Sequence, residues 1–423
     1  MKLCITNARH LGAPVNLLVE DGIIRTMVPA SHEFSADVTR DATIHDAGGQ
    51  ILMPSLIDAH VHLREPGFEY KEDVASGLKA ALHGGFGAVM CMANTHPVND
   101  SAAVTSFIIE QGRRAFPHGP FVHPVGAATM GLKGEEMAPL GELKEAGCAA
   151  ISNDGRSMER AELLRRVMEY AADLGLTVID HCEDYSFGKG AVMNEGVVSG
   201  RIGVKGQPDV GESMQVARDI LLAEYLDLPV HIAHVTCKSA VDLIAWGKAR
   251  GVKVTAETCP HYLVLDETAL TDYGTAAKVC PPLRTAADRE ALVQAVKDGT
   301  LDIMVTDHAP HANYEKETTL DSAPNGMIGL DVALSLMWRL VMEGTLQEAD
   351  IVRLWCTKPG EIHHLPVNTF TPGDRADFFL FDPEARWVVG PDTLHSKSHN
   401  TPFLGQTLPG RVTAHWLGGN KIL

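Results

Sequence analysis

The sequence predicts an α/β protein in which a (β/α)8 TIM-like barrel carries a small β-sandwich built from both chain ends. In the middle of the chain, eight apolar β-type runs alternate with helical periodicity, and eight parallel strands are the number that closes such a barrel. Both chain ends are instead series of short strands separated by turn residues. A length of 423 residues accommodates a barrel of about 250 residues and a smaller second unit.

The two ends are expected to form one small unit. Strands are predicted at residues 3–6, 15–20 and 23–28, with Asp21-Gly22 as a hairpin turn between the last two, and no helix is expected before residue 52. Further strands are predicted at 377–381, 387–389 and 411–417. We therefore expect the sandwich to comprise residues 1–52 and 365–423, and the barrel to comprise residues 53–364.

The barrel strands are expected at residues 56–62, 88–92, 121–125, 149–153, 176–181, 229–234, 253–257 and 302–306. Helices are expected at 74–83, 159–174, 212–225, 240–250 and 286–297. A doubly wound open sheet is the main alternative, but no Gly-x-Gly-x-x-Gly follows any of these strands. Residues 185 to about 211, which are rich in glycine, are expected to form a long loop over the site.

Charge and composition exclude several function classes. The formal charge of −18 argues against a surface that binds nucleic acid or an anionic membrane. No stretch has the length of a membrane span, and the apolar run at the start is too short for a signal peptide. The eight cysteines include no Cys-x-x-Cys pair, which is typical of free thiols in a reducing compartment. We expect a cytoplasmic protein.

The stretch from Asp58 to Gly67 is the first candidate for a functional site. In an extended strand His60 and His62 point to the same face, where two imidazoles can bind one metal ion. The Glu-Pro-Gly that follows ends the strand, so both histidines lie where it leaves the barrel, and barrel enzymes keep their chemistry there. Taken alone, His-x-His is more often a packed or surface pair than a ligand pair.

Other strand ends supply further metal donors. Asp154, His181, His234 and Asp307 stand at the carboxyl ends of the predicted strands 4, 5, 6 and 8. A single residue of this kind is usually a turn former or a helix cap, and Asn153-Asp154-Gly155 is compatible with plain turn chemistry. His231 is the alternative to His234 on strand 6, but His234 lies nearer the strand end. Six coincidences in one ring are much less plausible than a metal site.

Six donors are too many for one tetrahedral zinc that keeps an open position. Two metals use them better, with His60, His62 and Asp307 on one side, His181 and His234 on the other, and Asp154 between. Such a site activates water and polarises a carbonyl, which indicates hydrolysis of an amide-like bond or its reverse. Asp307 is then placed to carry a proton between the nucleophile and the leaving nitrogen.

The motifs together resemble the dihydroorotases of the amidohydrolase superfamily, more narrowly the bacterial long-chain class with an aspartate as metal bridge. The resemblance rests on His60-Val61-His62 with Leu63-Arg64-Glu65-Pro66-Gly67, Asn94-Thr95, Asp154-Gly155, His181-Cys182-Glu183, His234-Val235 and Asp307-His308-Ala309-Pro310-His311. It implies reversible cyclisation of N-carbamoyl-L-aspartate to L-dihydroorotate in pyrimidine synthesis, with one or two zinc ions. It also implies a possible homodimer and possible association with aspartate transcarbamoylase.

The resemblance assigns the substrate contacts as well. Arg64, Asn94 and His311 correspond to the residues that hold the substrate carboxylate, and a guanidinium suits that group because it binds carboxylate bidentately. The remaining substrate contacts fall on His62, Cys280, Asn325 and Gly326.

The sequence departs from the family pattern at Ser55, Ala93, Asn153, Cys280 and Asn325. Cys280 matters most, because a thiol in place of an amide removes strong hydrogen-bonding groups. Two alternatives stay open. One is a related cyclic amidohydrolase of the allantoinase or hydantoinase type, although strand 4 offers no lysine for carboxylation near its end. The other is a non-catalytic barrel that scaffolds aspartate transcarbamoylase.

Overall fold

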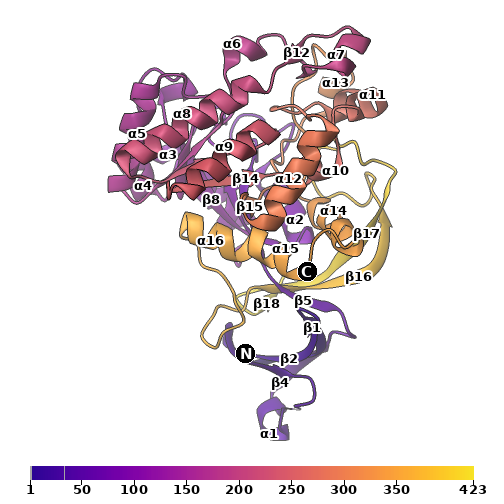
Figure 1. Cartoon of the computed structure of the whole chain (residues 1–423). Helices are drawn as coiled ribbons and strands as arrows, with labels where there is room; N and C mark the ends of the chain where they lie inside the picture. Colours follow the sequence, from indigo (N-terminus) through magenta and orange to yellow (C-terminus); the bar gives the residue numbers. More distant parts are fainter. Residues whose placement is uncertain (1, 33) are drawn as a thin grey trace.

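The computed structural model describes residues 2–32 and 34–423, and it has two large sheets, each of eight strands. Figure 1 shows one sheet enclosed by helices and the other curling below it, next to both chain termini. A barrel joined to a sheet from both chain ends is therefore confirmed. No helix of the described residues has the length and apolar character needed to cross a membrane.

The barrel consists of parallel strands in chain order, with bounds β6 Leu56–Val61, β7 Phe86–Cys91, β8 Phe121–Ala127, β9 Ala150–Ser152, β10 Thr177–Asp180, β13 Val230–Ile232, β14 Val254–Thr258 and β15 Ile303–Met304. The backbone N–H of His62 donates to the carbonyl of His308 over 2.8 Å, and this bond connects the first strand to the segment after the last. Because the ring closes there, the histidines after β6 and the aspartate after β15 become neighbours.

The long helices cover the outside of the barrel: α2 Val74–His83, α3 Ala102–Ala115, α4 Leu140–Ala146, α5 Ala161–Asp173, α8 Val210–Leu226, α9 Lys238–Ala249, α12 Ala286–Asp298 and α14 Ala333–Met342. Helix α5 illustrates the cause, since it buries Leu164, Val167, Met168 and Ala171 on one side. Burying a leucine-sized side chain contributes about 1.5–3 kcal/mol. The Asp73 side chain fixes the start of α2 by accepting from the Ser76 N–H.

The second sheet joins the two chain ends in the order β18 Asn420–Lys421, β17 Thr407–Leu417, β16 Phe378–Val388, β5 Ile51–Pro54, β1 Lys2–His10, β2 Ala13–Glu20 and β3 Ile23–Pro29, with β4 Ala42–Asp46 also paired to β1. It surrounds an apolar core that includes Leu17, Ile24 and Phe378. Strand β5 crosses the boundary expected at residue 52. The expectation of no helix before that residue is wrong, because residues 36–39 form one turn, α1 Ala36–Thr39.

The segment after β10 is more ordered than the expected loop. It contains α6 Tyr185–Gly188, β11 Met193–Asn194, α7 Val197–Ile202 and β12 Gly206–Gln207, and the two short strands pair in parallel. The buried Arg284 holds it from below, donating to the side chain of Asn194 over 3.0 Å and to the carbonyl of Gln207 over 2.7 Å. A buried guanidinium needs such acceptors, and its bonds to β11 and β12 hold this segment in place.

Shorter helical segments complete the connections: η1 Met130–Leu132, α10 Pro260–Val264, α11 Ala269–Tyr273, η2 Gly274–Ala277, α13 Asn313–Lys316, α15 Glu348–Val352, η3 Arg353–Thr357 and α16 Lys358–His363. Several of them follow the carboxyl ends of barrel strands. They therefore contribute to the rim of the cleft that those strand ends form.

Candidate active site

A pocket of about 320 Å³ opens at the carboxyl ends of the barrel strands. It is lined by His62, Arg64, Asn94, Asp154, Gly155, His181, Tyr185, His234, Cys280, Asp307, Ala309, His311, Asn325 and Gly326. His60 is fully buried and contacts Asp154 and Asp307, two of the lining residues. All the residues singled out in the sequence therefore meet in one place, although they come from segments far apart in the chain.

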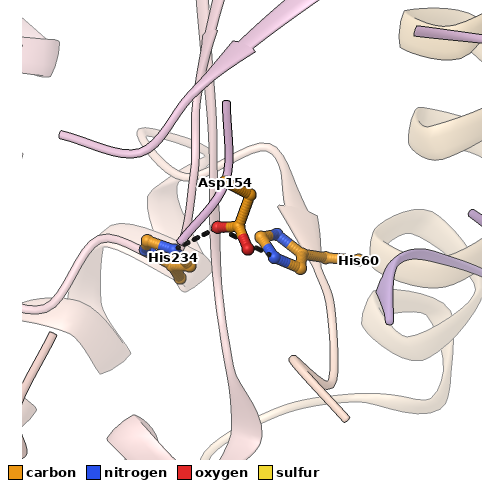
Figure 2. A group of neighbouring side chains, drawn as sticks. All are labelled: His60, Asp154 and His234. Carbon is orange, nitrogen blue, oxygen red and sulfur yellow. Dashed lines mark hydrogen bonds and ion pairs between the residues drawn. The ribbon is translucent and has the colours of Figure 1, made fainter. Parts of the chain in front are cut away.

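Asp154 stands at the centre of this cluster. Its Oδ1 lies 3.3 Å from Nε2 of His60, 3.3 Å from Nε2 of His234 and 3.2 Å from Nδ1 of His181. Figure 2 shows the carboxylate between the His60 and His234 rings. The second oxygen, Oδ2, faces His62 at 3.5 Å. One carboxylate thus reaches all four histidines, as the predicted position between two metals requires.

The donors divide into two groups on either side of Asp154. On one side, Oδ1 of Asp307 lies 3.1 Å from Nε2 of His62 and 3.8 Å from Nε2 of His60. On the other side, Nδ1 of His181 lies 2.9 Å from Nε2 of His234. His60 also lies within reach of the second group, because it and His234 face the same oxygen of Asp154, so the assignment of donors to two separate metals stays a prediction. His231 is not part of either group, because its ring contacts Thr255 and Glu257 inside the barrel.

The histidines are oriented by partners behind them. Nδ1 of His60 donates to Glu257 over 2.7 Å, and Nδ1 of His62 donates to the Asn94 Oδ1 over 2.9 Å. Nε2 of His181 donates to Glu183 over 2.8 Å. Each bond places a ring proton on the outer nitrogen, so that the inner nitrogen, which faces Asp154, is the one that can bind a metal. This is the arrangement of imidazoles that bind metal.

The donor set fits divalent cations on two further grounds. Nε2 of His60 is buried and makes no well-aligned hydrogen bond to any described residue, although Asp154 is near. Four carboxylates, those of Asp154, Glu183, Glu257 and Asp307, are buried together, and burying uncompensated charge is strongly unfavourable. Two divalent cations would balance four negative charges. Nitrogen and oxygen donors in this mixture suit zinc.

Electrostatics keep the acidic groups ionised. Burial alone would raise the pKa of Asp307, but the hydrogen bond from His62 and the neighbouring histidine charges lower it below its usual range. Burial would also raise the pKa of Glu183. The hydrogen bonds from His181, Cys280 and Gln207 outweigh burial and lower this pKa to about 2. Both groups are therefore carboxylates at neutral pH, and Asp307 is able to accept a proton.

Three of the site residues have a backbone conformation that side chains rarely adopt. The φ angles are +62° at Arg64, +30° at His234 and +46° at Asp307. Non-glycine residues in this region carry strain of about 1–3 kcal/mol each, and such residues cluster at functional sites. The surrounding fold holds these three side chains in place against that strain.

The predicted carboxylate-binding residues lie together at one side of the pocket. Nε of Arg64 donates to the carbonyl of Pro310 over 3.1 Å, which fixes the guanidinium where it lines the pocket. Asn94 accepts from His62 through its oxygen, so its amide N–H groups stay available. Nε2 of His311 donates to the carbonyl of Asn325 over 2.8 Å. Arg64 and Asn94 therefore keep hydrogen-bond donors for a carboxylate, whereas both ring nitrogens of His311 are already bonded, one to the Asn325 carbonyl and the other to Lys71.

Two residues that sequence reasoning did not single out complete this region. Nζ of Lys71 donates to Nδ1 of His311 over 3.3 Å and pairs with Glu315 at 2.9 Å. Tyr185 lines the pocket, and its ring lies parallel to that of His181. Glu257 was also missed, but a charged residue inside the apolar run 253–257 was a detectable signal, because an acid in a buried strand requires a partner.

The structure accounts for three of the departures from the family pattern. The Cys280 thiol donates to the Oε2 of Glu183 over 3.0 Å and also faces the pocket. The Oδ1 of Asn153 accepts from the Thr129 hydroxyl over 2.8 Å, so its side chain turns away from the metal donors. Ser55 is buried and contacts His415 of the second sheet. Nothing in the structure explains Ala93.

Comparison with known proteins identifies the family. A family model described as dihydro-orotase-like matches residues 49–240. A dihydroorotase of Geobacter metallireducens is 47% identical over 408 residues, covering 96% of this chain and 95% of its own length. The chain belongs to the dihydroorotase family. A dihydroorotase of Syntrophotalea carbinolica agrees, with 46% identity over 97% of this chain and 96% of its own length.

Solved structures with the same fold include a hydantoinase and a dihydropyrimidinase. An L-hydantoinase from Arthrobacter aurescens superimposes with a TM-score of 0.85 at 21% identity, covering 99% of this chain and 95% of the other. A dihydropyrimidinase from Brevibacillus agri gives a TM-score of 0.83 at 23% identity, covering 100% and 95%. These similarities show that the dihydroorotase family shares its fold with these proteins.

Proposed function

We propose that this member of the family is a zinc-dependent dihydroorotase, which interconverts N-carbamoyl-L-aspartate and L-dihydroorotate in pyrimidine synthesis. The observation that carries the proposal is one pocket lined by five of the six metal donors, with His60 in contact with Asp154 behind them, and lined as well by Arg64 and Asn94. The donors suit opening or closing of a cyclic amide, and Arg64 and Asn94 suit a ring that bears a carboxylate.

The six donors would hold the zinc ions, one between His60, His62 and Asp307 and the other between His181 and His234, with Asp154 shared. When bound, zinc supplies a Lewis acid and lowers the pKa of water to about 7. The protein's own contribution is to fix the imidazole tautomers through Glu257, Asn94 and Glu183. Burial of all six donors also excludes bulk water from the reacting atoms.

Substrate orientation follows from the polar side of the pocket. The guanidinium of Arg64 binds the carboxylate of the ring, and the amide of Asn94 donates to the same group. Because Asn94 also accepts from His62, the group that holds the carboxylate is connected directly to a metal donor. His62, Cys280 and the segment Asn325–Gly326 border the ring, and the ring amide is thereby presented to the metal donors.

Asp307 carries the proton. In ring opening its carboxylate takes the proton of the attacking water and delivers it to the departing ring nitrogen, and in ring closure it carries a proton the other way. Its ionised state at neutral pH and its contact with His62 support this role. General acid–base catalysis of this kind contributes roughly 10²–10⁴-fold to a rate.

The test is a substrate panel. Zinc-loaded protein should interconvert carbamoyl-L-aspartate and dihydroorotate, and it should act at least 100-fold less well on hydantoin, allantoin and dihydrouracil, which lack the carboxylate. Preference for a carboxylate-free ring would assign the protein to the hydantoinase or allantoinase type. No turnover of any ring by protein with full zinc content would favour the non-catalytic scaffold.

We further propose a homodimer that associates with aspartate transcarbamoylase in the cytoplasm, on the strength of the family resemblance. We also propose that the chain divides into a barrel domain, residues 53–364, and a β domain, residues 1–52 and 365–423, with strand β5 continuing to Pro54 across that boundary. Size-exclusion chromatography of the protein, alone and mixed with the transcarbamoylase, tests the first part. Elution of this protein at its monomer mass in both runs would contradict it.

A further inference from the structure

A third group of metal-type donors lies beside the two described above. Of the eight cysteines, all of which the structure describes, seven are buried, and Cys280 alone is partly exposed where it lines the pocket. Its Sγ lies 3.0 Å from the Oε2 of Glu183, and Nε2 of His181 lies 2.8 Å from the same oxygen. A thiol, a carboxylate and an imidazole therefore converge on one point at the edge of the pocket.

We propose that Cys280, Glu183 and His181 form an additional binding site for a thiophilic divalent cation such as zinc or cadmium. The inference goes beyond the proposed reaction, because it depends only on these three donors and on their access from the pocket. A mixture of sulfur, nitrogen and oxygen ligands favours zinc-like cations over magnesium or calcium.

The three donors are held in place by neighbours that leave their ligand atoms free. Nε2 of Gln207 donates to the Oε1 of Glu183 over 2.7 Å, which turns the other oxygen toward Cys280 and His181. The Ser157 hydroxyl donates to the carbonyl of His181 over 2.6 Å and accepts from the N–H of Glu183 over 2.9 Å. The backbone of both residues is thus fixed, and a preorganised site binds more tightly.

The ring of His181 would serve both sites through its two nitrogens. Nδ1 faces Asp154 at 3.2 Å, whereas Nε2 faces Glu183 on the opposite side. Ligand atoms around a tetrahedral zinc stand about 3.5 Å apart, as its bond lengths require. The hydrogen-bonded separations of 2.8 and 3.0 Å must therefore widen by roughly half an ångström. Rotation of the Cys280 side chain at the open edge of the pocket can provide this.

The proton balance follows from the hydrogen bonds. Binding breaks the S–H bond of Cys280, and that proton passes to water. The Nε2 proton of His181 moves to Nδ1, which then donates to Asp154, when the neighbouring site is empty, and passes to water when a cation holds Nδ1. Bonds form from Sγ, from Nε2 and from the Oε2 of Glu183, which is already a carboxylate. Binding must therefore strengthen as the pH rises.

Another cluster of similar composition does not offer such a site. Asp180, Cys182 and Asp219 also lie together, but the guanidinium of Arg218 binds both carboxylates at 2.7 Å. This arginine supplies the positive charge that a metal would otherwise provide. Among the described residues no lysine or arginine pairs with Glu183, so the Cys280 group has no such internal cation.

The experiment measures cadmium binding to the full-length protein. Apo-protein is titrated with cadmium chloride, the bound metal is counted by equilibrium dialysis, and the sulfur-to-cadmium absorption is followed in the ultraviolet. Cys280→Ser removes the sulfur ligand, and Glu183→Gln weakens the carboxylate ligand. Cys356→Ser is the matched control, because its thiol is buried and donates to the carbonyl of Asn368.

We expect the wild type and Cys356→Ser to bind one cadmium ion per chain more than Cys280→Ser, and to show the sulfur absorption that Cys280→Ser lacks. Glu183→Gln should bind this ion at least tenfold more weakly. Equal stoichiometry in wild type and Cys280→Ser, or no sulfur absorption in the wild type at saturating cadmium, would overturn the proposal. Cyclisation by the zinc-loaded wild type is a separate assay, so this site and the proposed function can fail independently.

Discussion

The floor and the polar side of the pocket are built in different ways. The floor consists of donors at barrel strand ends, with His60 0%, His234 2% and Asp154 4% exposed, and partners inside the barrel fix its rings. The polar side consists of Arg64, Asn94 and His311 on the loops that follow the strands, next to the exposed Asn325. From this comparison we expect the rigid part to determine the type of reaction and the loop part to determine which ring enters.

The largest effect is expected from the floor. Asp307→Asn removes the proton carrier while keeping an oxygen ligand, so kcat should fall roughly 10³–10⁴-fold. Zinc content, measured by atomic absorption, should stay within a factor of two of wild type. Turnover within tenfold of wild type would show that the floor does not use Asp307 for proton transfer.

A smaller but selective loss is expected from the polar side. Arg64→Ala should lower kcat/KM for dihydroorotate by roughly 10²–10³-fold, since removing one partner of a buried charge pair costs about 2–5 kcal/mol. Any weak activity on dihydrouracil should change much less, because that ring lacks the carboxylate. Equal losses of kcat/KM for dihydroorotate and dihydrouracil would mean that Arg64 stabilises the floor of the pocket and does not bind the substrate.

The residues that accept hydrogen bonds from the outer ring nitrogens of the floor histidines should control zinc affinity. Glu257→Gln weakens the acceptor for Nδ1 of His60, and zinc affinity should fall roughly 10–100-fold in a chelator competition. Asp302→Asn is the matched control, because Asp302 pairs with Lys248 at the opposite end of the strands. If both variants lose zinc equally, the loss reflects the stability of the barrel and not the orientation of His60.

The smallest effect concerns Lys71. Burial first, and then the charges of Arg64, Lys71 and Lys316, lower the pKa of His311 to about 2, so His311 is neutral at physiological pH. Lys71→Met removes one donor to this ring, and KM should rise about tenfold with little change in kcat. Burial, the largest cause of the low pKa of His311, persists in the variant, so the ring stays neutral and the ratio of the variant and wild-type KM values should be constant between pH 6 and 8. Lys71→Arg should restore most of the affinity, and a ratio that changes with pH over this range would contradict this role.

Sequence reasoning located most of the floor, because metal donors at the ends of apolar strands form a recognisable pattern. His60, Asp154 and Asp307 are each separated by more than ninety residues, yet the barrel rule places them in one ring. The choice of His234 over His231 also agrees with the geometry, since only His234 faces Asp154. The position nearest the strand end was the deciding signal.

The supporting residues were harder to find. Lys71 contacts His311, which is distant in the sequence, and Glu183 contacts His181, which lies two positions before it. No sequence periodicity indicates such side-chain hydrogen bonds. The sequence predicts a loop after β10 because the elements of this segment are only two to six residues long. Arg284, which is distant in the sequence, holds them in place. Single-sequence patterns carry no information on which distant partner a polar side chain will meet.

The pairing of β5 with β16 has a consequence for biosynthesis. Strand β5 directly precedes β6, the strand that carries His60, and its second edge is covered only by Phe378–Phe381. While the ribosome is still translating the barrel, that edge has no partner, and an unpaired edge invites pairing with other chains. A product that terminates before residue 378 would keep the edge open permanently, which makes prematurely ended chains targets for chaperones and proteases.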